Sequence, residues 1–257
     1  MQGKQESSHE ALLGQQFGAR AAAYLNSAVH AQGADLEALA DLVRGNSDAR
    51  VLDLGCGGGH VSFAVAPHAG SVTAYDLSTE MLDVVARAAS ERDLNNIRTE
   101  KGVVERLPFA DASFDFVFSR FSAHHWWDFD VGLREAARVL KPKGVAAFVD
   151  SVCPGVPLFD TYLQSVELLR DPSHVRSYSR AEWDAAIARA GLVCTATRTH
   201  RLRLIFPVWV ERMSTPKLQC DAIRALQNAM SEGVRRYFNI GSDGSFDLNV
   251  MFAQATK

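Results

Sequence analysis

The stretch VLDLGCGGGH, residues 51–60, places a short apolar segment directly before a cluster of glycines and a histidine. Val51–Leu54 has the length and character of a buried strand, and the cluster Gly55–Gly59 follows without a spacer. Glycine has no Cβ, so a cluster of this kind lets the main chain press against a small molecule. The stretch therefore predicts a ligand site where the first strand ends.

Strand-like and helical segments alternate after this stretch. Strands are expected at 51–54, 71–76, 97–100, 114–119 and 145–150, with helices over 61–66, 78–92 and 131–140. This alternation predicts an α/β fold with a parallel sheet and helices on both faces. Right-handed crossovers then bring the loops that follow the strands to one edge, where such sheets bind ligands.

The segments outside this alternation are mainly helical. The first helices are expected over 10–32 and over 35–43, with Asp35 as a candidate N-cap of the second. After residue 150, helices are expected over 159–169 and from the capping box of Ser179 and Glu182 to Gly191. Strands follow at 193–206 and 246–253, with a largely helical insert at 208–238 between them. We expect one domain, 1–257, with a core at 45–150 and helical lid or substrate elements at 1–44, 151–192 and 207–240.

Composition excludes several classes of protein. The 257 residues are 47% hydrophobic and 22% charged with a net charge of −3, which gives no strong field to attract nucleic acid or a membrane. Apolar runs long enough to cross a bilayer and a signal-peptide pattern are both absent from the sequence. The four cysteines are far apart and suggest neither a disulfide framework nor a zinc site. We expect a cytoplasmic protein with no bound metal and no membrane insertion.

The glycine cluster does not fit the two commonest nucleotide motifs. A dinucleotide-binding G-x-G-x-x-G needs a small residue at its sixth position, where this chain has His60. A phosphate-binding loop would end in Gly-Lys followed by Ser or Thr, which is also missing. A nicotinamide-dependent oxidoreductase therefore remains only as a weaker alternative.

The pattern D-x-G-x-G-x-G, formed by Asp53, Gly55, Gly57 and Gly59, resembles that of the class I S-adenosylmethionine-dependent methyltransferases. The segment GVVERLPFADASFDFVFSR, residues 102–120, is similar to that family's G-D-A-E-x-L-P-F and F-D-x-V motifs, and RVLKPKG at 138–144 is similar to R-V-L-K-P-G-G. The resemblance covers residues 51–150. FGARAAAYLNS, residues 17–27, looks like the leading helix of the ubiquinone- and menaquinone-biosynthesis-like small-molecule enzymes.

This resemblance implies a Rossmann-like sheet of seven strands, with the last antiparallel, and S-adenosyl-L-methionine as cofactor, with S-adenosyl-L-homocysteine as product. It implies that the glycine turn meets the amino-acid end of the cofactor and that the acid after the second strand accepts hydrogen bonds from the ribose. The NH of Val104 would read the adenine, because Val103 replaces the acid common at that position. The implied cofactor-binding residues are Tyr24, Asp53, Gly55, Gly57, Gly59, Asp76, Leu77, Met81, Val103, Val104, Glu105 and Ser119.

The acceptor side is less marked in the sequence. Methyl transfer requires alignment and exclusion of water, and it requires a base only if the acceptor loses a proton. The loop SRFSAHHWWD, residues 119–128, lacks the Asn/Asp-Pro-Pro-aromatic tetrad of nucleic-acid methyltransferases, which disfavours nucleic acid. It offers Arg120, His124 and His125 as catalytic candidates, although a loop histidine packed against tryptophan is an equal alternative.

Two further groups were candidates for the acceptor pocket. His174, Arg176 and Tyr178 lie in the segment expected to form a lid. Four arginines around the sixth strand suit an acidic acceptor, although a solvated face explains them as well; they are Arg198, Arg201, Arg203 and Arg212. The sequence thus predicts methyl transfer to oxygen, carbon or nitrogen of a small molecule, with a non-catalytic S-adenosylmethionine-binding protein as the alternative, and it does not fix the oligomeric state.

Overall fold

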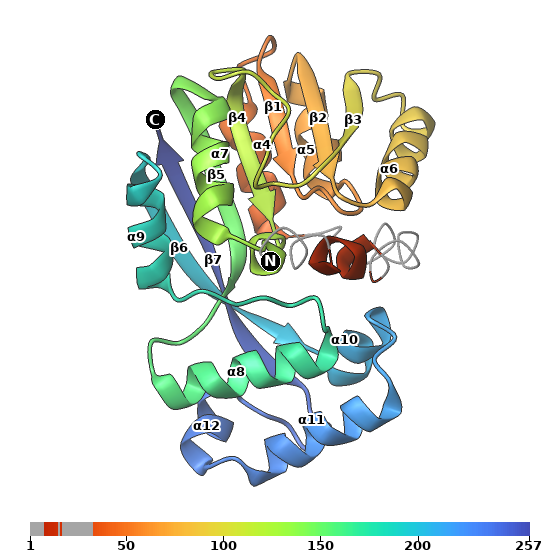
Figure 1. Ribbon diagram of the computed structural model, residues 1–257, viewed down its shortest axis with the longest axis vertical. Helices are drawn as coiled ribbons and strands as arrows, with labels where there is room; N and C mark the ends of the chain where they lie inside the picture. Colours follow the sequence, from red (N-terminus) through yellow and green to blue (C-terminus); the bar gives the residue numbers. More distant parts are fainter. Residues whose placement is uncertain (1–7, 15, 17–32) are drawn as a thin grey trace.

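The computed structural model describes residues 8–14, 16 and 33–257 (Figure 1). The described residues form a seven-stranded sheet in the order β3-β2-β1-β4-β5-β7-β6. The strands are β1 (Arg50–Leu54), β2 (Ser71–Asp76), β3 (Ile97–Lys101), β4 (Phe114–Arg120), β5 (Leu140–Val152), β6 (Val193–Leu204) and β7 (Phe246–Thr256). Strands β1 to β5 pair in parallel, and β7 is antiparallel to β5 and β6. The predicted Rossmann-like sheet with an antiparallel last strand is confirmed.

Helices cover both faces of this sheet. They are α4 (Ala34–Val43), α5 (His60–Val65), α6 (Thr79–Glu91), α7 (Phe129–Val139), α8 (Pro157–Arg170), α9 (Arg180–Arg189), α10 (Phe206–Arg212), α11 (Lys217–Ala229) and α12 (Glu232–Tyr237), with single 3-10 turns η1 (Ala66–His68) and η2 (Ala123–His125). Helices α4 and α5 pack on one face, and α7 and α9 pack on the other.

Of the two helix caps predicted at α9 and α4, one forms and the other does not. The predicted capping box at α9 is confirmed, because Ser179 accepts from the N–H of Glu182 while the Glu182 side chain accepts from the N–H of Ser179. The prediction of Asp35 as a cap is wrong. Gly33 occupies the cap position of α4, and the Asp35 carboxylate instead forms an ion pair with Arg120.

The carboxyl ends of three neighbouring strands meet at one edge of the sheet. β1 lies between β2 and β4, with Leu54 opposite Tyr75 and Asp53 opposite both Ala74 and Phe118. Because these strands are parallel, the chain leaves all of them in the same direction. The glycine stretch, the turn after β2 and the loop after β4 therefore come together in space.

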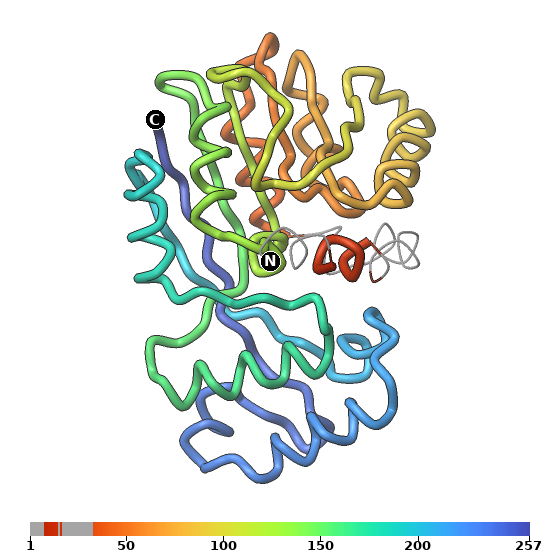
Figure 2. The backbone as a smooth tube through the Cα atoms, viewed as in Figure 1, coloured from red at the N-terminus to blue at the C-terminus, as the bar shows by residue number. Residues whose placement is uncertain are grey.

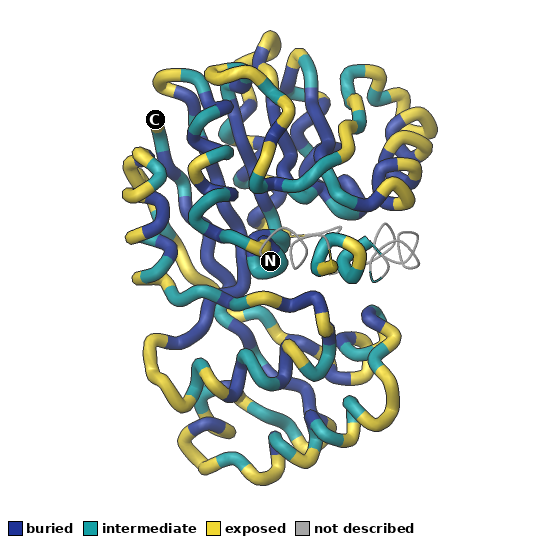
Figure 3. Tube along the Cα trace, viewed as in Figure 1, coloured by how far each residue is buried: buried dark blue, intermediate teal, exposed yellow. Residues whose placement is uncertain are grey.

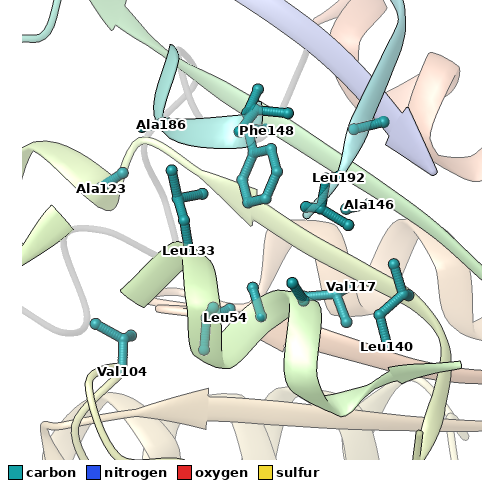
Figure 4. Packing of buried hydrophobic residues seen from close by; sticks show 14 of the residues in the cluster. Leu54, Val104, Val117, Ala123, Leu133, Leu140, Ala146, Phe148, Ala186 and Leu192 are labelled. Atoms are coloured by element: carbon teal, nitrogen blue, oxygen red, sulfur yellow. The ribbon is translucent and has the colours of Figure 1, made fainter. Parts of the chain in front are cut away.

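Each face of the sheet carries its own apolar core. Figure 4 shows Leu54, Val117, Leu133 and Phe148 of one core packed between the strands and α7. The strand residues are buried from both sides, which explains why β1, β2 and β4 read as continuous apolar runs rather than alternating ones (Figure 3). Burial of each large side chain contributes about 1.5–3 kcal/mol, so this packing fixes the strand ends that form the edge described above.

A second, mostly helical region lies below the parallel strands in Figure 2. This helical lobe consists of α8, α10, α11 and α12 packed on the adjoining ends of β6 and β7 (Figure 1). Tyr162, Trp209, Phe238 and Phe246 are buried in its separate core. Long strands β6 and β7 thus connect the two cores, and the predicted strands at 193–206 and 246–253 are confirmed.

Two expectations from the sequence need a correction or fall outside the described chain. β5 begins at Leu140, five residues earlier than the expected 145, because Leu140 pairs with Phe114 of β4, and the register shifts between Phe114 and Phe116. Residues 8–14 are helical, as predicted for the start of the 10–32 helix. Tyr24 and the motif at 17–27 lie outside the described residues.

Candidate functional site

A cavity of about 470 Å³ lies at the carboxyl edge of β1, β2 and β4. Its lining comes from residues within 9–14, 53–61, 76–81, 102–106, 120–122 and 125–131. Among the described residues, none from 132–257 contributes to the lining, so the helical lobe does not form a wall of this cavity. The helical residues 8–14 cover it instead, between the sheet and the lobe (Figure 1).

The glycine turn after β1 has the backbone conformation that favours glycine. Gly55, Gly57 and Gly59 have φ angles of 71°, 49° and 80°. A Cβ on Gly55 would meet Ser122 Oγ at 1.9 Å, so this position is closed by the loop after β4. A Cβ on Gly57 would meet nothing within 4 Å, and Gly57 lines the cavity. The exposed backbone at Gly57 is thus the part of the turn open to a ligand.

Gly59, a predicted cofactor-binding residue, does not line the cavity, whereas His60 does. Gly59 is absent from the described lining, and a Cβ there would lie 2.9 Å from Phe63 and Val85, so its small size serves helix packing. His60, the first residue of α5, lines the cavity. The residue that breaks the dinucleotide motif therefore takes part in the site.

Two carboxylates lie beside the glycine turn, and hydrogen bonds fix both. Asp76 Oδ2 accepts from the N–H of Gly57 at 2.9 Å, and its Oδ1 accepts from the N–H of Ser78 at 2.9 Å. Asp53 Oδ2 accepts from the N–H and Oγ–H of Ser62 at 3.0 and 2.7 Å. Burial raises the pKa of both, that of Asp53 to about 7, against the hydrogen bonds that they accept. Asp76 therefore ties β2 to the glycine turn and keeps lone pairs available for a ligand.

The next part of the lining is apolar with one acid. Leu77 and Met81 enter it from the turn after β2 and from α6, and Val103 and Val104 enter it from the segment after β3. Glu105 also lines the cavity, where its carboxylate accepts from the N–H of Asp128 at 3.2 Å. Burial raises the pKa of Glu105, against that hydrogen bond. This region suits a flat, largely apolar group.

The loop after β4 forms the opposite wall. Arg120 lines the cavity and forms a buried ion pair with Asp35, which holds its guanidinium against α4. Phe121 adopts a φ of 52°, an unusual conformation for a bulky residue. Ser122 Oγ accepts from the indole N–H of Trp126 at 3.1 Å, so the loop is held in one shape.

The N-terminal helical residues meet this wall. His9 lies over Trp127, with ring centroids 5.6 Å apart, and its Nε2 donates to the backbone oxygen of His125 at 3.0 Å. His9, Glu10, Leu13 and Gly14 complete the lining. The wall is therefore built from aromatic and imidazole rings supplied by two distant parts of the chain.

The structure separates the two adjacent histidines that the sequence offered as alternatives. His125 lines the cavity, whereas His124 lies outside the described lining with its Nδ1 2.6 Å from Asp150 Oδ1. Burial disfavours the protonated form of both rings and therefore acts to lower both pKa values. The Asp150 carboxylate outweighs burial at His124 and raises its pKa, while the nearby His124 charge helps to lower the pKa of His125 to about 4.

Other sequence candidates lie away from the cavity. Ser119 is buried in β4, and its Oγ has no hydrogen-bond partner in the part of the chain described. In the segment after α8, His174 is bonded to Gln164, Arg176 pairs with Asp160 and Glu182, and Tyr178 stacks on Phe129. Arg201 and Arg203 pair with Asp247, and Arg198 lies over the Phe252 ring. These three arginines and Arg212 lie outside the described lining of the cavity. The arginines that do line it are Arg106 and Arg120.

Several lining residues were not singled out as site residues from the sequence. They are His9, Glu10, Leu13, Gly14, Cys56, Gly58, His60, Val61, Ser78, Gly102, Arg106, Phe121, Ser122, Trp126, Trp127, Asp128 and Val131. For the residues next to the glycine turn and in the loop after β4, closeness in sequence to a recognised motif was a signal that could have indicated a place in the site. The residues at 9–14 carry no motif, and only the folded chain brings them here.

Metal binding and membrane crossing each require features that the described residues, 8–14, 16 and 33–257, do not have. They contain no group of three or more His, Cys, Asp or Glu side chains placed to hold a metal ion. None of their helices combines the length and the apolar character that a membrane crossing requires.

Several of the proteins that are similar to this chain are named as methyltransferases. A family described as a methyltransferase domain matches residues 52–148. The uncharacterized protein YafE of Escherichia coli is 48% identical over 199 residues, which cover 77% of this chain and 96% of YafE. A demethylmenaquinone methyltransferase of Listeria monocytogenes is 34% identical over 149 residues, or 55% of this chain and 63% of its own.

YcgJ of Bacillus subtilis is similar over nearly the whole chain. This uncharacterized methyltransferase is 34% identical over 246 residues, which cover 94% of this chain and 97% of YcgJ. Its crystal structure superposes with a TM-score of 0.83 and covers 87% of this chain and 97% of its own. The likeness therefore includes the helical lobe as well as the glycine turn.

Proposed function

The chain belongs to the class I S-adenosylmethionine-dependent methyltransferases, and we propose that it transfers a methyl group from S-adenosyl-L-methionine to a small molecule in the cavity at the sheet edge. One observation carries this proposal. Gly57 offers bare backbone to the cavity and donates its N–H to Asp76 of the adjacent strand, so a main-chain cradle and a carboxylate face the same space.

The lining fits this cofactor part by part. The exposed backbone at Gly57, with Asp53 behind it, would hold the amino-acid end, and the remaining lone pairs of Asp76 would accept from the ribose hydroxyls. Gly55, whose N–H donates to the backbone oxygen of Tyr75, would shape the turn. The apolar region would enclose the adenine and is formed by Leu77, Met81, Val103 and Val104, with Glu105 at its border. Gly59 and Ser119 would act indirectly, by fixing the turn and the end of β4.

The chemistry then depends mainly on alignment. The bound cofactor supplies a methyl group on a positively charged sulfur, and the acceptor must approach in line with the bond that breaks. Arg120, His125 and the tryptophans of the loop after β4 would position the acceptor, while the helical residues 8–14 would exclude water. Arg120 would act as a fixed orienting group, since Asp35 holds it.

A binding experiment tests the donor half of this proposal. S-Adenosylhomocysteine and NADH are each titrated into the purified protein in a calorimeter. We expect S-adenosylhomocysteine to bind at one site per chain and NADH to give no binding heat. Binding of NADH alone would contradict the proposal and favour a nicotinamide-dependent enzyme.

A transfer experiment tests the acceptor half. The protein is incubated with methyl-labelled S-adenosylmethionine and cell extract divided into small-molecule, protein and nucleic-acid fractions. We expect label in the small-molecule fraction. Label confined to a macromolecular fraction would refute the small-molecule acceptor, and cofactor binding without any transfer would favour the non-catalytic alternative.

A further inference from the structure

Beside the cavity, three histidines and three acids form a largely buried cluster where the sheet meets the segment that follows α8. The ring centroids of His124 and His125 are 4.2 Å apart, and that of His174 is 5.6 and 6.4 Å from them. The acids Asp150, Glu167 and Asp171 are at most 7% exposed. Of these six residues, His125 is the one that appears in the described lining of the cavity.

Hydrogen bonds fix the tautomer of His125. Its Nδ1 lies 3.1 Å from the backbone oxygen of Ser173, and a carbonyl oxygen only accepts, so Nδ1 carries a proton. The nitrogen able to take up a further proton is therefore Nε2. That atom lies 3.9 Å from Oδ2 of Asp171.

Asp171 is itself held in one orientation. Its Oδ1 accepts from the N–H and the Oγ–H of Ser173 at 2.9 and 2.6 Å, which leaves Oδ2 toward His125. Its own N–H donates to the backbone oxygen of Glu167 at the end of α8. Burial raises the pKa of Asp171, but His125 and the Ser173 hydrogen bonds outweigh burial and bring it below its ordinary value. Asp171 thus faces His125 as a carboxylate.

Burial and the charges around His125 favour the neutral form of its ring. Burial and the charge of His124 lower its pKa to about 4, and Asp171 and Asp150 act in the opposite direction. His124 has its own counter-ion in Asp150, whereas Glu167 and Arg170 lie next to Asp171. The pKa values of the two adjacent imidazoles are thus shifted in opposite directions, an arrangement typical of sites that separate an acid from a base.

We propose that His125 removes a proton from the methyl acceptor and that Asp171, in the segment after α8, is the positioning residue that holds His125 and stabilises its protonated form. This inference rests on the proposed function and specifies its substrate class, an acceptor whose attacking atom loses a proton, such as a hydroxyl or an acidic N–H or C–H. The proton passes to Nε2 of His125. The electron pair that it leaves forms the bond to the methyl carbon, while the carbon–sulfur bond breaks and its electron pair stays on sulfur. His125 then returns the proton to water.

An NMR experiment tests the electrostatic part without any turnover. Protein labelled with ¹⁵N-histidine is saturated with S-adenosylhomocysteine and titrated, and the His125 signals are assigned from the spectrum of His125→Gln. We expect the Nδ1–H tautomer, with a protonation midpoint that moves to lower pH in Asp171→Asn. An Nε2–H tautomer, or a midpoint unmoved by that substitution, would overturn the inference.

An activity experiment tests the catalytic part. Label transfer from methyl-labelled S-adenosylmethionine to the small-molecule fraction of the extract is followed from pH 5 to 9. We expect His125→Gln to lower the rate about 10²–10⁴-fold, as loss of a general base does. Asp171→Asn should lower it about tenfold and move the acidic limb of the profile to lower pH, with unchanged affinity for S-adenosylhomocysteine.

Two further variants separate catalysis from folding. Asp160→Asn removes a carboxylate that pairs with Arg176 in the same region but contacts none of the three histidines, and it should leave the pH profile unchanged. Ser173→Ala keeps the charge of Asp171 but removes the hydroxyl that contacts both Asp171 Oδ1 and His125 Nδ1, so it should lower the rate and leave the acidic limb of the profile close to that of wild type. Wild-type transfer with no effect of Asp171 or Ser173 would refute this inference alone, whereas absence of wild-type transfer would refute the proposed function as well.

Discussion

A single carboxylate, that of Asp76, connects two neighbouring strands at the proposed donor site. It accepts one hydrogen bond from the glycine turn and one from the start of α6, so it is oriented before any ligand arrives. A group fixed in this way loses little entropy on binding. Residues of this kind are the ones whose roles can be tested singly.

Asp76→Ala should weaken the binding of S-adenosylhomocysteine by about 1–3 kcal/mol, because charge-assisted hydrogen bonds to the ribose would be lost. This corresponds to roughly a 5- to 150-fold rise in Kd, measured by calorimetry. Asp83→Ala, at an exposed position of α6, is the control and should leave Kd unchanged. Equal affinity of wild type and Asp76→Ala would place the ribose elsewhere.

At the residue scale, the positions of the glycine turn and of Asp76 at the strand ends followed from the sequence, since backbone freedom and a strand-end acid are local properties, while their roles toward the cofactor stay predictions. It did not separate His124 from His125, because their difference comes from Asp150 on another strand and from Ser173 after α8. It also missed His9, whose place over Trp127 depends on a contact between residues far apart in sequence. Roles set by distant partners were thus beyond local patterns.

At the scale of elements, α9 offers a direct test of how local sequence fixes a helix. Ser179→Ala removes the side chain that accepts from Glu182 N–H, and it should lower the free energy of unfolding by about 1 kcal/mol, as measured by urea denaturation. Ser231→Ala is the matched control, because Ser231 precedes α12 without a capping hydrogen bond. Equal losses in the two variants would show that the capping box is not the source of the stability.

β1, β2 and β4 were predictable to within a few residues because each is a short, largely apolar and buried run bounded by polar or glycine residues. The start of β5 was not, since Lys141, Pro142 and Lys143 read as a turn, and the pairing of Leu140 with Phe114 of β4 extends the strand. Asp35 shows the same limit, because a distant arginine removed it from its expected capping role. Tertiary partners overrode local preference in both cases.

At the scale of the whole molecule, the buried histidines should make the joint between sheet and helical lobe sensitive to acid. Burial lowers the pKa of His174 to about 2 and that of His125 to about 4, from an ordinary value of 6.5. Below pH 6.5 the unfolded chain therefore binds protons that the folded chain does not. The contribution of these two histidines to the free energy of unfolding decreases as the pH falls. His124, whose pKa is raised, acts in the opposite sense.

His174→Gln should consequently flatten the fall in the free energy of unfolding between pH 6.5 and 4 by about 1.4 kcal/mol per pH unit, the effect of one proton. Urea denaturation at several pH values measures this slope. His200→Gln on the exposed strand β6 should keep the wild-type slope. A His174→Gln slope equal to that of the wild type would mean that His174 takes up its proton in the folded state.

The division of labour along the chain has a consequence for how such enzymes diversify. The lining of the cavity comes from described residues before position 132, whereas the helical lobe begins at α8 and the segment after it contacts His125 through Asp171 and Ser173. Recombination that exchanges the whole lobe would therefore redirect the enzyme to new metabolites, provided that the new lobe keeps the two contacts to His125. The residues proposed to bind the methyl donor would remain unchanged in such a recombinant.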